Sequence, residues 1–454
     1  MVQPRININV QSNFRLGGGI LYATGAIIGA SSWGDLGVVK TLTSFSDIKN
    51  LYKEGDLVKG AEQFFATGGR ELKLLRIAGG TPVKASLNLV GGGNTAIVVT
   101  AKYEGTHGND ISIAVTENGS NRDIRVTSGS FVENFTDLAD NDEIVKTLNG
   151  SQFVTATKST NTLISSLTAT NLTGGNNGDI LTSADIVDAL ETKLWLVDFD
   201  YLILPGINSD TIHSSISAML TNRSKEENKE SILVTGGIKF EHIETTLSRN
   251  AINSEGRIVF VHSSLYIGNS QIEEDFNEEN YLDATYTACA YAGMLCRLPV
   301  NTSPTFKSIG VLTANKLGVS EYTRQERANL INKGVTVITT TATGSFGPYM
   351  AVTRNGNEME WTFMLDSVRK VSFMKSNLFN ITKRYIGEPN DDTTRTSIKG
   401  SVQGFLESQV DDRIIQNYNL EVQRGTDPRA VKINAEVLLI NEVSYIDISF
   451  ILNI

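Results

Sequence analysis

The side chains with the greatest chemical potential lie in a segment that alternates strands and helices. The residues that could form a nucleophilic triad there are His213, His262, Asp198, Asp210 and Ser263. A triad needs a serine, a histidine that takes its proton and a carboxylate that orients the histidine. The carboxyl ends of parallel strands are where α/β sheets bind ligands. An α/β hydrolase-like enzyme with a β-rich accessory domain is therefore one hypothesis, although the spacing of these residues does not require it.

Other signatures of catalysis or cofactor binding are missing from the sequence. It has no G-x-S-x-G, H-E-x-x-H or C-x-x-C motif. The glycines of GGGNTA precede an apparent strand, whereas a dinucleotide site needs a helix N-terminus there. Gly17, Gly18 and Gly19 lack the Lys and Ser or Thr of a phosphate loop, so we interpret them as a hinge. Cys289 and Cys296 lie seven residues apart on an apolar helix and are interpreted as reduced core thiols. We expect no catalytic residue, no cofactor and no metal.

Length and charge narrow the class of protein. The 454 residues are enough for about three domains, and 40% hydrophobic with 20% charged residues is typical of a packed globular protein. The net charge of −10 argues against direct binding of nucleic acid, which needs clustered cations. No apolar run is long enough to span a membrane. We expect a protein that is made and assembled in a cytoplasm, with no signal peptide and no membrane insertion.

Two segments alternate apolar strands with helices. From Gly25 to Ile77, apolar residues at helical spacing end at Gly68 and Gly69, and ELKLLRI then reads as a buried strand. From Thr182 onward, the apolar runs YLIL, ILV and IVFV are separated by single helices, as parallel strands buried on both faces are. The pattern predicts a layered sheet covered by helices.

The stretch from Thr81 to Asn177 differs in composition and in pattern from the segments on either side of it. It is rich in Thr, Asn, Ser and Gly, and its short strands include TAIVVTA, DISIAVTE, NRDIRVTS and QFVTATKS. The only helical period in it is ENFTDLADNDEIVKTL. Turn-forming clusters bound the stretch on both sides, so we predict a β-rich domain inserted into the α/β core.

Further elements follow towards the C-terminus. A long apolar helix is predicted near Tyr281 to Arg297, and a second in SEYTRQERANLINKG, with Ser320 as its N-cap and Gly334 as its stop. Beyond Trp361, two helices and a set of strands form a last unit.

Both ends of the chain alternate apolar and polar residues, as strands with one apolar face do. The apolar positions are Ile6, Ile8 and Val10 near the start and Ile446, Ile448, Phe450, Leu452 and Ile454 at the end. An exposed apolar edge strand is an aggregation hazard. Either each strand completes the sheet of its own chain, or it pairs with a neighbouring chain by strand addition.

The segment from Asp366 to Arg384 is locally basic in an acidic protein. On a predicted helix, apolar residues are interleaved with the cations Arg369, Lys370, Lys375, Lys383 and Arg384. One interpretation is a docking surface for an acidic partner. The other is an ordinary amphipathic helix whose lysines stay in water.

Several stretches form a wider pattern in chain order. GAIIGASSWGDLG carries a glycine-spaced strand and a Trp-Gly turn, and FFATGGRELKLLRIAGG carries a double aromatic, Gly-Gly and Arg76 in a strand. EGTHGNDISIAV, LPVN, ANLINKGVTVIT and EWTFMLDSVRKV follow. Together they resemble the contractile tail sheath proteins of myophage tails, phage-tail-like bacteriocins and related injection systems. Asp35 stands where a proline is common in that family, Thr336 replaces an expected Asn, and the usual Trp-Gly-x-Arg-Thr element is not evident around Gly347 to Arg354.

The resemblance implies a multidomain α/β and α+β fold. It comprises an N-terminal linking arm, a layered α/β core, an inserted β-sandwich-like domain, a C-terminal α+β inner domain and a C-terminal linking strand. The sheet of the inner domain is completed by terminal strands of neighbouring subunits. The corresponding ranges are 1–22, 23–80 with 178–350, 81–177, 351–440 and 441–454.

The resemblance also implies a non-enzymatic structural role. Sheath subunits assemble as stacked hexameric rings around an inner tail tube, and they contract from a metastable extended state to drive the tube through a cell envelope. The implied partners are further copies of the chain, the tail tube protein, and baseplate and tail terminator proteins. The implied location is the host bacterial cytoplasm during assembly, and then a virion tail or a bacteriocin-like particle. Within this picture the glycine run is the hinge of the arm, and the five cations are expected to face the tube.

Two alternatives to a sheath stay open from the sequence. One is the hydrolase-like enzyme already described. The other is a different self-assembling capsid or surface protein, which would form shells or flat sheets rather than tubes.

Overall fold

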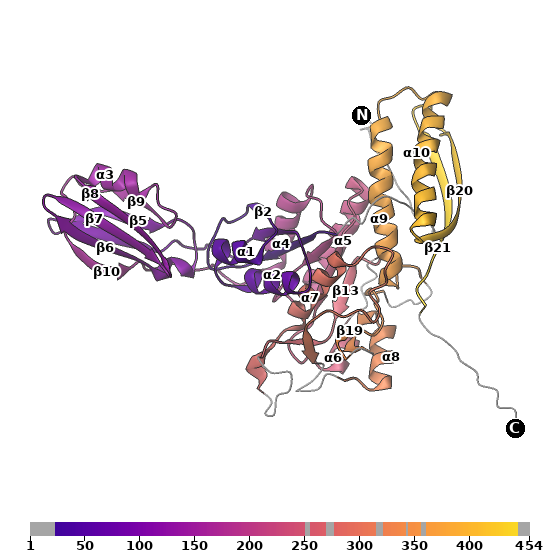
Figure 1. The fold of residues 1–454 in the computed structure, drawn as a ribbon, viewed down its shortest axis with the longest axis horizontal. Helices are drawn as coiled ribbons and strands as arrows, with labels where there is room; N and C mark the ends of the chain where they lie inside the picture. Colours follow the sequence, from indigo (N-terminus) through magenta and orange to yellow (C-terminus); the bar gives the residue numbers. More distant parts are fainter. Residues whose placement is uncertain are drawn as a thin grey trace. The chain divides into compact units, whose positions relative to one another are not determined.

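The computed structural model describes residues 23–249, 255–268, 277–314, 321–341, 344–355 and 360–443 (Figure 1). The chain forms two compact units. Unit 1 comprises the described parts of Met1–Ala26, Gln63–Leu72 and Trp195–Ile454, and unit 2 comprises Ile27–Glu62 and Lys73–Leu194.

The helices are distributed over both units. The α-helices are α1 Phe45–Tyr52, α2 Asp56–Ala66, α3 Asn141–Leu148, α4 Ser183–Ala189, α5 Asp210–Glu227, α6 Ile243–Ser248, α7 Ala284–Arg297, α8 Arg324–Asn332, α9 Leu365–Thr382 and α10 Asp392–Asp411. Short 3₁₀ or π turns occur at Thr106–Asp110, Leu190–Leu194, Glu278–Asn280 and Lys383–Tyr385. Among the described residues, no helix is long and apolar enough to cross a membrane.

The strands form several sheets. They are β1 Gly25–Gly29, β2 Val39–Leu42, β3 Leu72–Arg76, β4 Ser86–Gly91, β5 Asn94–Ala101, β6 Ile111–Asn118, β7 Asn121–Ser128, β8 Phe131–Leu138, β9 Val154–Lys158, β10 Leu167–Asn171, β11 Tyr201–Ile203, β12 Ile232–Gly236, β13 Ile258–Val261, β14 Ser264–Tyr266, β15 Tyr281–Leu282, β16 Leu312–Ala314, β17 Val335–Thr336, β18 Ile338–Thr340, β19 Phe346–Pro348, β20 Ile415–Arg424 and β21 Val431–Leu439. The chain is thus a mixed α/β multidomain protein, as predicted.

The largest sheet has the strand order β17-β13-β12-β11-β1-β3-β2. Strands β11, β12, β13 and β17 are parallel, with Leu202 opposite Leu233 and Val234 opposite Val259. Every residue of β11, β12 and β13 is buried, which explains why these strands consist mostly of apolar residues. The predicted parallel pairing of YLIL, ILV and IVFV is confirmed.

Helix α7 packs on β12 and is buried along almost its whole length. Its Gly293 permits a close approach, because a Cβ there would lie 2.1 Å from the carbonyl oxygen of Phe64. One turn earlier, the Ala290 carbonyl accepts a 2.6 Å hydrogen bond from the Thr67 hydroxyl.

Strands β4 to β10 of unit 2 form two antiparallel sheets, with the orders β10-β6-β7-β8 and β4-β5-β9. Their buried side chains, with those of α3, belong to one hydrophobic cluster. The prediction of a single helical period in ENFTDLADNDEIVKTL is wrong in its first half. Residues up to Leu138 complete strand β8, and the helix begins only at Asn141, where the Asp140 carboxylate accepts from the Glu143 backbone N–H.

The last part of unit 1 is built from α9, α10 and the antiparallel hairpin β20–β21 (Figure 1). Val402 and Leu406 of α10, Met374 of α9 and Val437 of β21 belong to its core. The outward face of β20 is polar, so this hairpin has one face on a core and one in water.

The N-cap predicted for α8 is wrong. The cap is Thr323 rather than Ser320: its hydroxyl accepts a 3.2 Å hydrogen bond from the Glu326 backbone N–H, and the Glu326 carboxylate accepts from the Thr323 backbone N–H at 2.8 Å. This reciprocal pair is a capping box, which satisfies two backbone donors that the helix itself leaves unpaired.

Candidate functional site

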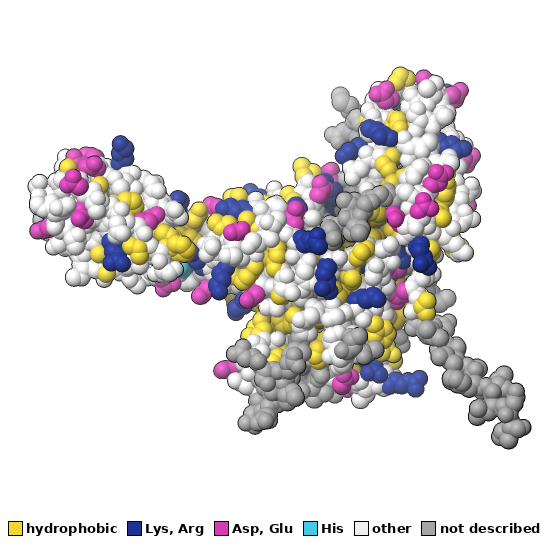
Figure 2. Space-filling model, in the orientation of Figure 1, with side chains coloured by type: hydrophobic (Ala, Val, Ile, Leu, Met, Phe, Trp, Pro, Cys, Tyr) yellow, Lys and Arg dark blue, Asp and Glu magenta, His cyan; other side chains and the backbone are white. Residues whose placement is uncertain are grey.

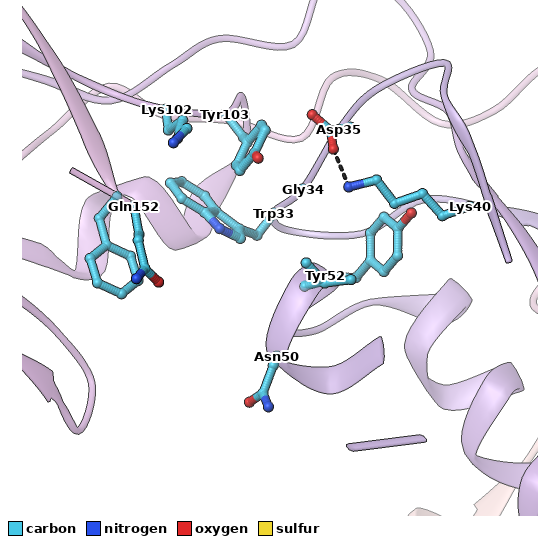
Figure 3. Close-up of a pocket in the computed structure, with 11 residues that line it drawn as sticks. Trp33, Gly34, Asp35, Lys40, Asn50, Tyr52, Lys102, Tyr103 and Gln152 are labelled. Atoms are coloured by element: carbon cyan, nitrogen blue, oxygen red, sulfur yellow. Dashed lines mark ion pairs between the residues drawn. The ribbon is translucent and has the colours of Figure 1, made fainter. Parts of the chain in front are cut away.

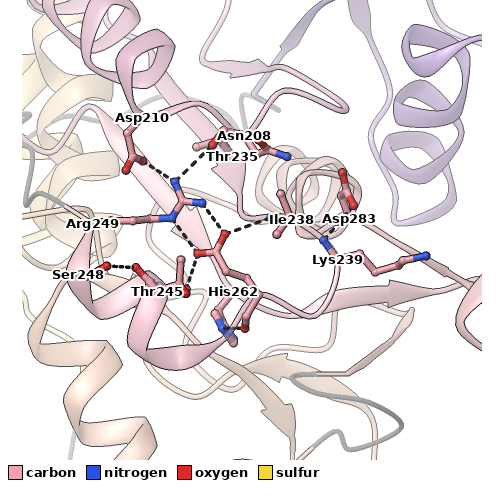
Figure 4. Close-up of polar contacts among 12 residues, drawn as sticks. Asn208, Asp210, Thr235, Ile238, Lys239, Thr245, Ser248, Arg249, His262 and Asp283 are labelled. Atoms are coloured by element: carbon pink, nitrogen blue, oxygen red, sulfur yellow. Dashed lines mark hydrogen bonds and ion pairs between the residues drawn. The ribbon is translucent and has the colours of Figure 1, made fainter.

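The carboxyl ends of the parallel strands, where an α/β enzyme would bind its ligand, are filled by a charged cluster (Figure 4). The Arg249 guanidinium forms an ion pair with Asp210 at 2.8 Å and donates to the Glu241 carboxylate, also at 2.8 Å. The Thr246 hydroxyl donates to the same carboxylate at 2.6 Å. Burial alone would raise the pKa of Glu241, but the bonds from Arg249 and Thr246 hold the pKa below its usual value. The carboxylates of Asp210 and Glu241 are therefore already bonded to side chains of the same chain.

His213 lies at the edge of this cluster. Its Nε2 is 2.9 Å from the Thr235 hydroxyl and its Nδ1 is 3.8 Å from Asp210. Its side chain is only 1% exposed, so a substrate has no direct access to it. Asp198 is elsewhere, on the surface, paired with Lys229. The structure thus brings His213 near Asp210, whereas Ser263, the serine considered as a nucleophile, is bonded to Tyr322.

His262 and Ser263 are joined by a third residue, Tyr322. The Tyr322 hydroxyl lies 2.9 Å from His262 Nδ1 and 2.8 Å from the Ser263 hydroxyl. On the other side, His262 Nε2 lies 2.9 Å from the Glu241 backbone carbonyl, which can only accept. Nε2 therefore carries the proton and Nδ1 accepts from Tyr322, whose oxygen accepts from Ser263. Burial lowers the pKa of His262, so the ring stays neutral. With a backbone carbonyl in place of a carboxylate, this chain of bonds is a structural link and no triad.

The Tyr322 link gives a first testable prediction. Tyr322→Phe removes the hydroxyl that His262 Nδ1 accepts from and leaves Ser263 only its longer 3.4 Å bond to the Ile338 carbonyl, at a cost of about 1–3 kcal/mol of unfolding free energy. Urea unfolding followed by circular dichroism measures this. Tyr349→Phe, at a more exposed tyrosine, is the control and should change stability by less than about 0.5 kcal/mol. Equal stabilities of the two variants would contradict the bonding scheme.

Metal-binding and redox groups are scarce in the described ranges. No group of three or more His, Cys, Asp or Glu side chains there is arranged to hold a metal ion. Cys289 and Cys296 are both buried thiols, not joined in a disulfide, as the sequence predicted. Burial raises the pKa of the Cys296 thiol well above its usual value, which keeps it protonated and unreactive.

A cavity of about 250 Å³ lies in unit 2 beside the Trp-Gly turn (Figure 3). Aromatic side chains and an ion pair between Lys40 and Asp35 line it. Trp33 packs edge-on against Tyr103, with ring centroids 5.1 Å apart. The lining includes no histidine, serine or cysteine, and its Asp35 carboxylate is held in the ion pair with Lys40.

Arg76 explains why the Trp-Gly turn and the strand arginine occur together. Its side chain is fully buried and donates to the carbonyls of Ser31 at 3.1 Å, Gly34 at 2.6 Å and Glu104 at 2.8 Å. Gly34 has φ +99, and a Cβ there would lie 2.7 Å from the Leu51 carbonyl oxygen. The turn therefore needs glycine, and the arginine fixes it in place.

The basic helix, α9, is not the exposed face that the sequence suggested. Arg369, Lys370 and Lys375 are only 4%, 3% and 9% exposed, so both earlier interpretations are wrong for these three residues. Their cationic groups bind inside unit 1: Lys370 pairs with Asp366 at 2.5 Å and Lys375 with Glu230 at 2.6 Å. The remaining two cations, at the end of the helix, are exposed.

The hairpin β20–β21 is the most unusual surface of unit 1. Within the described ranges, the sheet contains only these two strands, ten and nine residues long, so neither outer edge has a strand neighbour. In the view of Figure 2, acidic and basic side chains are intermixed over α10 and β20, without a patch of one sign. Two strands alone are marginal in water, and an unpaired edge offers its backbone groups to another strand.

Comparisons with known proteins agree with this architecture. The model of the phage tail sheath protein central domain matches residues 180–346, and that of the phage tail sheath C-terminal domain matches residues 365–453, together more than half of the chain. This chain belongs to the contractile tail sheath family.

Individual sheath proteins show how far the likeness extends. The tail sheath protein of Staphylococcus phage Twort is 25% identical over 292 residues, which are 62% of this chain and 47% of that protein. The chain thus spans about half the length of this curated relative. The crystal structure of a sheath tail protein from Desulfitobacterium hafniense has a TM-score of 0.70 at 16% identity, covering 96% of this chain and 100% of that one. The anti-feeding prophage helical sheath in its contracted state has a TM-score of 0.57 at 11% identity, covering 99% of each chain. The two solved structures share the fold.

Several residues proposed for the sheath function lie outside the described residues. They are the strand positions Ile6, Ile8, Val10, Ile446, Ile448, Phe450, Leu452 and Ile454, and the hinge Gly17, Gly18 and Gly19. Their roles remain predictions. Sequence reasoning missed Glu442, which lies just before the C-terminal segment, because a single acidic residue outside any motif gives no signal.

Proposed function

We propose that this chain is the structural subunit of a contractile tail sheath. Copies of it stack as hexameric rings around an inner tail tube and contract from a metastable extended state to drive the tube through a cell envelope. Its partners are other copies, the tail tube protein, and baseplate and tail terminator proteins. Assembly takes place in the bacterial cytoplasm, and the product is a virion tail or a bacteriocin-like particle. The role is mechanical and involves neither catalysis, nor direct contact with nucleic acid, nor membrane insertion.

The observation that carries the proposal is the open hairpin β20–β21, together with the alternating apolar pattern at both ends of the chain. Strands from neighbouring subunits would add to its two edges and complete the inner-domain sheet. Such pairing covers the edges and links subunits through main-chain hydrogen bonds. Those bonds persist when domains rotate as rigid bodies, provided that a hinge absorbs the rotation, which is the role we assign to Gly17, Gly18 and Gly19.

Because three of the five cations are buried, we place the contact with the tube at the C-terminal end of α9. Lys383 and Arg384 are the two cations there that face solvent. Contacts of exposed charges are weak and screened by salt, which suits a surface that must release its partner during contraction.

The strand-exchange part of the proposal is tested by a matched pair of substitutions at the C-terminus. Ile448→Asp places a charge on the apolar face of the predicted strand, whereas Ser449→Asp places the same charge on the other face. Each purified protein is scored for helical tubes by negative-stain electron microscopy. We expect Ile448→Asp to reduce tube yield at least about tenfold, because a buried charge without a partner is costly. Ser449→Asp should assemble like the unmodified chain.

Deletion of residues 445–454 is the stricter form of the test. We expect the truncated chain to stay folded and to form no tubes. Tubes of normal yield from this variant would overturn the strand-linked sheath. Flat sheets or closed shells from the full-length chain would point instead to another kind of self-assembling protein.

A further inference from the structure

The chain leaves the hairpin through a short segment that is bound to unit 1 at an unexpected point. Glu442 follows β21 by three residues, and its carboxylate accepts hydrogen bonds from the Ser303 hydroxyl and from the Thr305 hydroxyl, the latter at 3.0 Å. Its neighbours Asn441 and Val443 are exposed, Val443 to 76%, whereas Glu442 is partly buried. Glu442 is thus the one residue of the segment 441–443 that is partly buried rather than exposed.

The receptor for Glu442 is itself held in place. The Thr305 hydroxyl accepts from the Ala351 backbone N–H at 3.2 Å, and the Ser303 hydroxyl accepts from the Thr305 backbone N–H at 3.1 Å. The 302–306 turn therefore has little freedom to follow the carboxylate if it moves. It presents two hydroxyl donors at a fixed position.

A second contact holds the same segment two residues earlier. The Lys370 ammonium of α9 donates to the Ile440 carbonyl at 2.7 Å, while the Ile440 N–H donates to the Ile414 carbonyl at 3.0 Å. Lys370 is kept in position by its ion pair with Asp366. The segment is therefore fixed at two points, Ile440 and Glu442, immediately before the last eleven residues.

The Glu442 contact has an energetic cost that needs a reason. Burial, with the nearby negative charge of Asp366, raises the pKa of Glu442 above its usual value. A glutamate left in water would avoid this cost. The hydrogen bonds from the two hydroxyls and the positive charge of Lys370 oppose this rise in the pKa, and the hydroxyls can do so only while they reach the carboxylate.

We propose that Glu442 is a positioning residue that fixes where residues 444–454 leave the subunit. The proposal rests on the proposed function, in which this segment links neighbouring subunits. A free tail samples many directions, and the apparent affinity of a binding segment falls by the fraction of time it spends in the competent arrangement. If Ile440 and Glu442 are already fixed before assembly, less conformational entropy is lost when the segment adds as a strand.

The test uses the unassembled chain and a spin label at the exit point. Val443→Cys is labelled with a nitroxide, since the native Cys289 and Cys296 are buried and do not react. In this background we compare Glu442→Ala, Glu442→Gln and the control Glu436→Ala, an exposed glutamate on β21. A label at Leu438→Cys, also on β21 and 51% exposed, reports on the hairpin itself.

We expect Glu442→Ala to raise label mobility at position 443 and to leave it unchanged at position 438. The protein concentration needed for tube formation should rise about tenfold, if the competent fraction falls by that factor. Glu442→Gln retains one acceptor, so its label mobility and its assembly concentration should lie between those of the unmodified Glu442 protein and of Glu442→Ala. Ser303→Ala should add little to Glu442→Ala, because the bond is already lost.

Two outcomes overturn the positioning role: unchanged mobility at position 443 in Glu442→Ala, or an unchanged assembly threshold. The same threshold shift in Glu436→Ala would also overturn it, because the effect would then be one of charge alone. Failure of the proposed function looks different. There the chain lacking residues 445–454 assembles normally, whatever Glu442 does.

Discussion

Arg369→Met is expected to lower the unfolding free energy of unit 1 by about 3–5 kcal/mol, because it leaves three acceptors without this donor, each at a cost of about 1–3 kcal/mol. The guanidinium is 4% exposed. Its acceptors are the Tyr201 hydroxyl at 2.9 Å and the carbonyls of Thr302 and Leu298, both at 2.8 Å. Methionine fills much of the volume but leaves all three acceptors without this donor. Urea unfolding of the unassembled chain, followed by circular dichroism, measures the loss.

Two further variants separate the possible causes of that loss. Arg369→Lys keeps the charge but not the planar fork that reaches three acceptors, so it should recover only a small part of the stability. Lys383→Met removes an exposed cation next to the end of the same helix and should change the free energy by less than about 0.5 kcal/mol. If Arg369→Met were as mild as Lys383→Met, the bonding of Arg369 described here would be wrong.

The burial of α9 shows why a pattern of charges can mislead. Cations spaced along a helix usually lie on its solvent-exposed face. The sequence near Arg369 and Lys375 does not indicate which residues they bind. Those partners, Tyr201 and Glu230, are more than 140 residues away in the chain. Local periodicity carries no information about such contacts, so sequence predicted the helix but not its surroundings.

Where the signal is local, the sequence predicted some elements correctly and missed others. The parallel strands β11, β12 and β13 were predicted from the apolar runs YLIL, ILV and IVFV, since a strand buried on both faces has no polar side. The capping of α8 was missed although its signal is also local. Thr323 and Glu326 have capping-box spacing, but Ser320 precedes them and competes as a cap.

The candidate sites also differ in whether the local sequence indicates them. Trp33, Gly34 and Arg76 were noted as a pattern, and the structure explains it through bonds to backbone carbonyls. Glu442 gave no signal, because its meaning depends on the hydroxyls of Ser303 and Thr305 on a distant turn. Of the triad candidates, His262 and Ser263 directly follow β13, whereas Asp198 precedes β11. Both histidines are bonded to internal partners.

The second large effect is expected at Glu230, which joins α9 to the α/β core. Its carboxylate pairs with Lys375 at 2.6 Å and with Arg257 at 2.5 Å, and it accepts from the Ser224 hydroxyl at 2.6 Å. Ser224 in turn accepts from Lys375 and Arg257 at 2.8 Å and 3.0 Å. Glu230→Gln leaves two buried cations facing each other without a negative charge. We expect a loss of about 3–5 kcal/mol in urea unfolding, against less than about 0.5 kcal/mol for the exposed Glu226→Gln.

Acid should reproduce the Glu230→Gln effect in the unmodified chain. Burial opposes ionisation of Glu230, but Arg257 and Lys375 outweigh it, and the pKa lies below the ordinary value of 4.5. A group whose folded pKa is depressed contributes stability above its unfolded pKa and loses that contribution as the pH falls through the folded value. Stability should therefore decline below pH 4.5 in the unmodified chain and decline less steeply in Glu230→Gln, which has no carboxyl to protonate at this position. Parallel pH profiles for the two proteins would show that Glu230 does not provide this part of the acid sensitivity, and that its pairing with Lys375 contributes little to holding α9 on the core.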